Sequence, residues 1–269
     1  MRISGYYRSS GFTPYWFAHV IFNVVRQGSA FARNLEELFG DMRASSLCNP
    51  FPRFSNLHAF IEDVTTDILL EGIGTGQDEG YQLLRDFLKH AGLPTDTLTV
   101  IEERGLAEMW GEPLWVSAHE SLVEEVFHIL FRDVVLLSRF NQLTSDYIIS
   151  FGEYVDGTDA RFTKRGRLKR QHVPQIIKNA IFHRDGGECR SCKRSLDRIV
   201  NPEMTERYDH IIPLAEGGAN DVTNLQLLCE RCNSSKSSRL DPVSPHYIRA
   251  YPLRASNYVS DTTPARRGT

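Results

Sequence analysis

The chain has 269 residues, of which 41% are hydrophobic and 24% are charged, a balance typical of a soluble globular protein with one large domain or two ordinary ones. It contains no run of 18 uncharged apolar residues and no secretory signal at its start, which excludes a membrane span and predicts a cytoplasmic protein. Residues 1–150 hold 11 Lys and Arg against 20 Asp and Glu, a balance of −9, whereas residues 151–269 hold 20 against 14, a balance of +6. Either the basic half faces a polyanion, or two unrelated solvated surfaces differ in composition.

The first 150 residues predict a mainly α-helical domain. Thr13 and Pro14 are typical of a helix start, and the apolar run from Tyr15 to Arg26 predicts a largely buried helix. Further helices are expected over residues 31–39, from Ser55 to about residue 70, and over residues 79–91 and 98–108. Glycines at positions 72, 74 and 76 follow a helix and lack a Gly-Lys-Ser/Thr ending, which indicates a turn between helices and not a phosphate loop.

The strongest helical pattern begins at Ser117, which forms a capping box with Glu120. Apolar residues then recur at spacings of three and four as far as Leu137, and they predict one long helix that is the spine of this domain or a dimer interface. His119 and His128 lie nine residues apart, which is not a metal-ligand spacing, so both are interpreted as structural. The pattern does not distinguish recognition, regulation and dimerisation as the role of this domain.

A basic linker is expected over residues 151–172. Its residues 161–170 contain six Lys and Arg and no acidic residue. A solvated linker and an arm that contacts phosphate both explain this composition, and the position directly before the cysteine motif favours the arm. The candidate nucleic-acid contacts in the linker are Lys164, Arg165, Arg167, Lys169 and Arg170.

Four of the five cysteines form two Cys-x-x-Cys pairs, Cys189 with Cys192 and Cys229 with Cys232, with 36 residues between the pairs. In a cytosolic chain such pairs indicate metal binding and not disulfides. Four thiolates at tight turns match the tetrahedral shell of Zn²⁺, and no position is left open for water, so we expect a structural zinc ion. Cys48 stands alone and is interpreted as a free thiol.

Between the cysteine pairs, Asp209 and His210 begin an apolar segment that breaks at Pro213, and Gly217 and Gly218 allow a tight return. With the cysteines, this arrangement resembles the HNH endonuclease family and its ββα-metal core. The resemblance covers about residues 173–240, and its order, spacing and residue types are carried by Cys189, Cys192, Asp209, His210, Pro213, Gly217, Gly218, Asn224, Leu225, Leu228, Cys229, Cys232, Asn233 and Lys236. The last letter of the family name is a histidine, and here Asn233 takes that position, so the chain resembles an H-N-N variant whose amide oxygen can still bind a hard cation.

Together with the helical pattern and the basic composition upstream, the resemblance predicts an α+β protein with four segments: a helical domain (1–150), the basic linker (151–172), a small zinc-stapled HNH nuclease domain (173–240) and a tail (241–269). It implies that His210 is the general base toward water, and that Asp209 and Asn233 ligate one catalytic Mg²⁺ or Mn²⁺ ion. Asn224 would hold the loop and orient His210 through a backbone hydrogen bond. The candidate phosphate contacts in this domain are Arg184, Arg231, Lys236 and Arg239.

The leading hypothesis is therefore an endonuclease that hydrolyses phosphodiester bonds in DNA, with RNA as the alternative substrate. Analogy with stand-alone family members implies a restriction or antiphage role, and double-strand cleavage would require a homodimer. Two other hypotheses stay open. A zinc-stapled nucleic-acid-binding module without catalysis predicts salt-sensitive binding that needs neither Mg²⁺ nor His210. A nuclease gated by a protein or ligand on the helical domain predicts more activity from a fragment that begins near residue 160.

Overall fold

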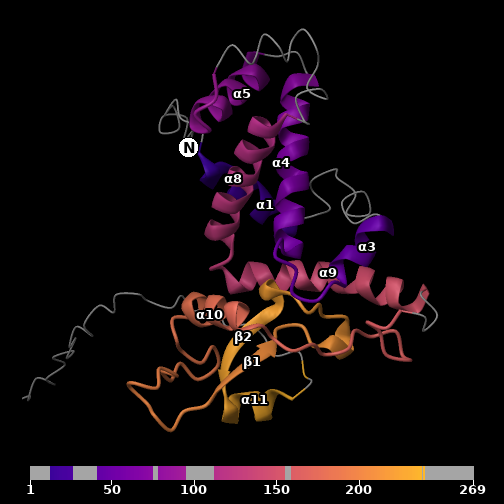
Figure 1. Ribbon diagram of the computed structural model, residues 1–269, viewed down its shortest axis with the longest axis vertical. Helices are drawn as coiled ribbons and strands as arrows, with labels where there is room; N and C mark the ends of the chain where they lie inside the picture. The colour runs from indigo at the N-terminus through magenta and orange to yellow at the C-terminus, as the bar shows by residue number, and fades with distance from the viewer. Residues whose placement is uncertain are drawn as a thin grey trace, which may run out of the picture.

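The computed structural model describes residues 13–26, 41–74, 78–94, 112–154, 159–237 and 239. It is mainly helical, with a two-stranded sheet in a small C-terminal module below the helices in the view of Figure 1. The N-terminal part contains helices α1 (Pro14–Arg26), α3 (Asp41–Leu47), α4 (Asn56–Gly74), α5 (Asp78–His90), α8 (Pro113–Leu130) and α9 (Val134–Tyr154). The C-terminal module contains α10 (Gln175–Arg184), β1 (Glu206–His210), the 3-10 turns η2 (Leu214–Glu216) and η3 (Val222–Asn224), β2 (Leu225–Cys229) and α11 (Glu230–Lys236).

Three of the helices expected from the sequence are confirmed as α1, α4 and α5. Ser55 caps α4, because its Oγ accepts the backbone N–H of His58 at 3.4 Å. This helix continues past residue 70 and ends at Gly74. The helices expected over residues 31–39 and 98–108, and the tail over residues 241–269, lie outside the described residues.

The expectation of a single long helix from Ser117 is wrong, because two helices occupy this stretch. α8 begins at Pro113, a favoured first residue, so Ser117 lies inside the helix and not at its start. The chain then turns, and Asp133 caps α9 by accepting the backbone N–H groups of Val135 and Leu136, each at 3.0 Å. α9 lies across the lower ends of the upright helices α4 and α8, between them and the C-terminal module (Figure 1).

The face of α8 that packs against α1 and α4 includes His119, which is 5% exposed. Its Nε2 lies 2.8 Å from Thr65 Oγ1 of α4, at hydrogen-bond distance. Burial disfavours a charged imidazole and lowers the pKa of His119 from 6.5 to about 4. His119 therefore packs in its neutral form between two helices of the core.

The stability of the full chain is expected to decrease as the pH falls from about 6.5 to about 4. In this window the unfolded chain binds a proton on His119 that the folded chain does not bind, so acid favours unfolding. The gap between the two pKa values corresponds to about 3 kcal/mol at its limit. Urea unfolding at several pH values measures the slope, and His119→Gln should remove only part of it, because burial lowers the pKa of His210 to about 4 as well. An unchanged slope in the variant would assign the pH dependence to other groups.

Residues 159–172, expected as a linker, pack against the rest of the chain. Phe162 and Leu168 form an antiparallel bridge, and both side chains are buried. Arg161 forms an ion pair with Asp159 at 2.6 Å and donates to the Ser45 carbonyl of α3 at 2.9 Å. The buried apolar residues of the helical part and of the C-terminal module belong to one continuous cluster. The two parts therefore share a core.

In the C-terminal module, β1 and β2 pair in antiparallel register, with Asp209 opposite Gln226 and His210 opposite Leu225. All five residues of β2 are buried. α11 packs against both strands, and α10 packs against β2. The α+β class expected from the sequence is confirmed, with a small ββα unit at its C-terminal side. Among the described residues, no helix has the length and apolar character needed to cross a membrane.

Candidate active site and metal centre

One cavity of about 460 Å³ brings together three of the four catalytic candidates from the sequence, all except Asn224. Asp209 and His210 reach it from the end of β1, and Asn233 reaches it from α11. Two basic residues, Arg170 and Lys236, line the same cavity. Its other lining residues are Pro213, Leu214, Ala215, Ser234 and Ser237. Residues far apart in the sequence therefore meet at a single opening.

The His210 ring is 3% exposed, and both of its nitrogens have neighbours within hydrogen-bond range. Nε2 lies 3.3 Å from Asn220 Oδ1, and Nδ1 lies 3.5 Å from Arg170 Nη2. Burial lowers the pKa of His210 from 6.5 to about 4, and the positive charge of Arg170 acts in the same direction. The imidazole is therefore neutral at neutral pH and can accept a proton.

Two cations surround the carboxylate of Asp209, which is 7% exposed. Lys236 Nζ donates to its Oδ2 at 2.7 Å and to the backbone carbonyl of His210 at 2.8 Å. Oδ1 faces Arg170 Nη2 at 3.7 Å, a distance too long for a hydrogen bond. One oxygen of Asp209 is therefore held by lysine, and the other is available toward the cavity.

Asn224 closes the loop that follows His210. Its side-chain Oδ1 accepts the N–H of Ile212 at 2.8 Å, and its Nδ2 donates to the carbonyls of Ile212 at 3.0 Å and Ala219 at 2.9 Å. Its backbone carbonyl accepts the N–H of Ile211 at 2.7 Å. The sequence predicted a backbone hydrogen bond between Asn224 and His210. Asn224 instead accepts the N–H groups of Ile211 and Ile212, the two residues after His210. Gly218 leaves room for this clamp, because a Cβ there would overlap the Ile212 carbonyl oxygen.

The four cysteines of the two Cys-x-x-Cys pairs form one cluster. The Sγ atoms of Cys189, Cys192, Cys229 and Cys232 all lie within 4.8 Å of one another. The backbone N–H of Cys232 donates to Cys229 Sγ at 3.4 Å, as in tight metal-binding turns. The cluster is compatible with a tetrahedral zinc ion, as the spacing of the pairs predicts.

The expectation that Arg184 contacts phosphate is wrong. Its side chain is 1% exposed and forms an ion pair with Asp185, from Nε to Oδ1 at 2.8 Å. Nη2 also donates to the Leu225 carbonyl at 2.6 Å, and the guanidinium lies 5.1 Å from the centre of the Phe131 ring. Arg184 lies between His183 and Asp185 in the sequence, and its charge is neutralised inside the module by Asp185.

Lys236, another candidate phosphate contact, lines the cavity, and its ammonium group is already bound by protein partners. Its side chain is 4% exposed, and its ammonium group is bound to Asp209 and to the His210 carbonyl. It forms part of the cavity wall and supports the two residues of the Asp-His pair. Arg239, at the end of the described chain, is exposed and donates to the Ser235 carbonyl.

The remaining candidate contacts differ in their distance from the cavity. Arg170 lines it, and Arg167 Nε donates to the carbonyl of Ala215, another lining residue, at 3.0 Å. Arg231 lines a second cavity of about 280 Å³ that Asp209 and His210 do not line. Lys164, Arg165 and Lys169 are exposed on the surface of the 159–172 segment.

The sequence analysis missed Asn220, which is 2% exposed and contacts the His210 ring. Its only local signal is its place in the loop that follows Gly217 and Gly218, where asparagine is a common turn residue. No sequence pattern predicts the contact between Arg170 and His210, which are 40 residues apart in the chain. Both contacts depend on how separate segments pack.

Residues 189–239 match the family model of the HNH endonucleases. This segment includes all four cysteines, the Asp-His pair and Asn233, so the C-terminal module contains an HNH domain. No curated protein and no solved structure matches the chain. A domain of this family indicates a nuclease that acts on nucleic acid and binds metal.

Proposed function

We propose that the chain is a metal-dependent endonuclease that hydrolyses phosphodiester bonds in DNA. The observation that carries the proposal is the cavity in which Asp209, His210 and Asn233 meet within an HNH domain. Hydrolysis requires a base for water and stabilisation of the charge that develops on the phosphate and the leaving oxygen. The residues of this cavity supply groups for each of these tasks.

His210 takes the role of general base. A neutral imidazole can accept the proton of an attacking water, and the pKa of His210 is lowered to about 4, so this form is present at neutral pH. The side chain is buried and lines the cavity, and Arg170, whose Nη2 lies 3.5 Å from its Nδ1, lines the same cavity. Its backbone is fixed by Lys236, and the next residues are fixed by Asn224.

The donor set fits a hard divalent cation. Asp209 Oδ2 is bound by Lys236 at 2.7 Å, whereas the nearest cation to Oδ1 is Arg170 Nη2 at 3.7 Å. Asn233 adds an amide group to the same cavity. Carboxylate and amide oxygens are ligands that Mg²⁺ and Mn²⁺ accept together with water. Asp209 and Asn233 would hold such an ion, and when bound it supplies Lewis-acid stabilisation of phosphate and leaving-group charge.

Arg170 is the residue best placed to bind the substrate phosphate. It lines the cavity, its side chain is 65% exposed, and its guanidinium lies within reach of both His210 and Asp209. The exposed residues Lys164, Arg165 and Lys169 extend the basic surface of the same segment. Such a surface would bind the phosphate backbone without regard to sequence, which supports a nucleic acid as the substrate class.

Other parts of the hypothesis stay predictions from the sequence. These are a restriction or antiphage role, a homodimer that cuts both strands, a regulatory partner for the helical part, and a cytoplasmic location. Zinc in the cysteine cluster and Mg²⁺ or Mn²⁺ in the cavity are the ions that we propose on chemical grounds.

Cleavage of supercoiled plasmid DNA by the full chain with Mg²⁺ or Mn²⁺ tests the proposal. The full chain is required, because the helical part and the module share a core and a fragment would expose it. His210→Ala should reduce the cleavage rate by about a hundredfold or more, whereas DNA binding should persist. His128→Ala is the matched control, because this histidine is 76% exposed on α8.

Cleavage by the wild type and the control, with loss only in His210→Ala, would support the nuclease and its base. Open-circle or linear product would then distinguish nicking from paired cutting. Equal cleavage by all three proteins would overturn the assignment of His210. Salt-sensitive DNA binding without cleavage at any divalent ion would favour the module that binds without catalysis.

A further inference from the structure

Asn220 lies in the loop between β1 and β2 with its side-chain amide oriented by two neighbours. Nδ2 donates to the Lys169 carbonyl at 2.9 Å. Oδ1 accepts the backbone N–H of Gln171 at 3.4 Å. A flipped amide would place its oxygen against the Lys169 carbonyl and its NH₂ group against the Gln171 N–H, and both contacts would be repulsive. The orientation of Asn220 therefore follows from its surroundings.

This orientation determines which nitrogen of His210 carries the proton. The atom of Asn220 that faces the ring is Oδ1, 3.3 Å from Nε2, and a carbonyl oxygen can only accept. Nε2 must therefore donate. On the other side of the ring, the Arg170 guanidinium can only donate, and its Nη2 lies 3.5 Å from Nδ1. Two independent contacts require the same tautomer, with Nε2 protonated and Nδ1 unprotonated.

We propose that Asn220 is a positioning residue that holds the His210 ring in the tautomer with a protonated Nε2 and thereby makes Nδ1 the atom that accepts the proton of water. This inference rests on the proposed function, because it names the reacting atom of its base. The hydrogen bond at one imidazole nitrogen decides the tautomer at the other. A ring in the opposite tautomer would present an N–H where a lone pair is needed. Because Nδ1 has a single lone pair, Arg170 must leave it for the substrate phosphate before water can take its place.

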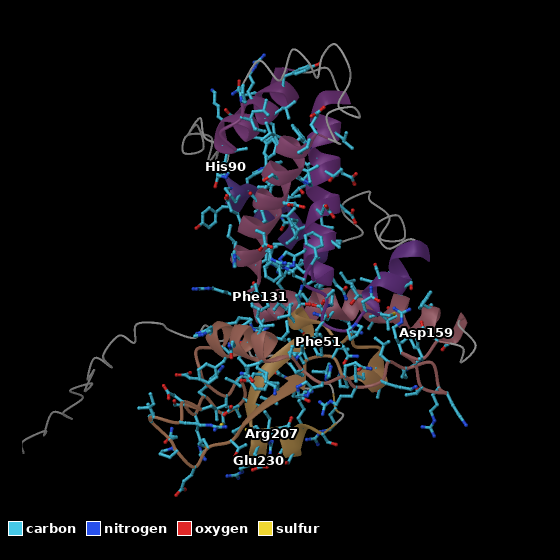
Figure 2. All side chains as sticks on the ribbon, in the orientation of Figure 1. Phe51, His90, Phe131, Asp159, Arg207 and Glu230 are labelled. Carbon is cyan, nitrogen blue, oxygen red and sulfur yellow. The ribbon has the colours of Figure 1, made fainter. Side chains whose placement is uncertain are left out.

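Asn220 is itself held by the helical part of the chain. Its backbone carbonyl accepts the N–H of Phe51 at 2.7 Å, and Phe51 lies where the helices meet the C-terminal module (Figure 2). The next residue, Asp221, is fully buried and accepts the Asn56 N–H at the start of α4 at 3.0 Å through Oδ2. Through Oδ1 it accepts the Thr223 N–H at 2.8 Å. Asn220 is therefore held by two parts of the chain: the 159–172 segment bonds its side chain, and α4 bonds the neighbouring Asp221.

Nitrogen-detected NMR of the full chain, labelled at its histidines, tests the tautomer directly at neutral pH. His210→Ala identifies the His210 signals by their absence. The wild type should show a protonated Nε2 and an unprotonated Nδ1 for His210. A protonated Nδ1 would overturn the proposal. This spectrum requires no cleavage, so it decides the tautomer even if the wild type cuts no DNA, a result that would count against the proposed function alone.

Two variants test whether Asn220 causes the tautomer. Asn220→Leu keeps the side-chain volume and removes the acceptor, so only the longer Arg170 contact then favours the wild-type tautomer. His210 should populate both tautomers, and kcat should fall with the fraction that keeps Nδ1 unprotonated, about twofold for equal populations, with KM for DNA little changed. Asn220→Asp keeps an acceptor toward Nε2 and should retain the wild-type tautomer, at lower stability because its second oxygen faces the Lys169 carbonyl. Metal content and thermal unfolding identify variants that fail to fold. A folded Asn220→Leu with the wild-type tautomer would overturn the role of Asn220.

Discussion

Replacement of Cys229 with serine is expected to remove the metal ion from the cysteine cluster and to unfold the C-terminal module. Cys229 ends β2 and begins α11, and its Sγ lies within 4.8 Å of the other three Sγ atoms. Thiolates this close repel one another unless a cation binds them. Structural zinc contributes about 10 kcal/mol or more to small metal-binding domains, which is comparable to the whole stability of a domain at about 5–15 kcal/mol.

The measurement combines metal analysis of the purified chain with thermal unfolding. The wild type should contain one zinc ion per chain, and Cys229→Ser should contain little and lose its cooperative transition. Cys48→Ser is the matched control, because Cys48 is also buried but lies in the helical part, where its Sγ donates to the Ala44 carbonyl at 3.2 Å. Full metal content in Cys229→Ser, or four cysteines oxidised to disulfides in the wild type, would contradict the prediction.

The second large effect is expected at the buried ion pair of Arg184 and Asp185. Asp185 is fully buried, accepts from Arg184 Nε at 2.8 Å, and accepts the backbone N–H of Leu227 at 2.8 Å. Asp185→Ala would leave a buried guanidinium without its counter-charge and a strand N–H without its acceptor. Loss of one partner of a buried pair costs about 3–5 kcal/mol, so the variant should unfold at a much lower urea concentration.

A surface pair of the same module provides the control. Arg207 Nη2 and Glu230 Oε1 are 2.6 Å apart at the outer side of the sheet (Figure 2), with side chains 45% and 60% exposed. Arg207→Ala should cost about 0–1 kcal/mol, because water and salt screen exposed pairs. Urea unfolding followed by circular dichroism compares the two variants. Equal midpoints would mean that the Arg184–Asp185 pair contributes no more than a surface contact.

Local spacing made the cysteine cluster of the module predictable. Each Cys-x-x-Cys pair spans four residues, Asp209 and His210 are adjacent, and Asn233 directly follows Cys232, so tight turns fix these local groups with little help from the rest of the chain. Helix existence was predictable for the same reason, since α1, α4 and α5 follow local apolar periodicity and cap residues. Helix ends were harder to predict. α8 begins at Pro113, before Ser117, and Asp133 divides the continuous apolar pattern into α8 and α9.

The sequence by itself therefore determined the cysteine cluster, the residue types of the candidate site and the α+β class of this protein. Only the tertiary structure decided which charges face the cavity. The charges of Arg184 and Lys236 are paired with aspartates inside the module. Arg170, by contrast, belongs to the 159–172 segment and faces His210. Asn220 acquires its partner in the same way, through contacts with Lys169 and Phe51. The physical reason is that buried polar groups form hydrogen bonds with the groups that pack against them. Local sequence patterns do not predict which groups those are when they come from distant segments.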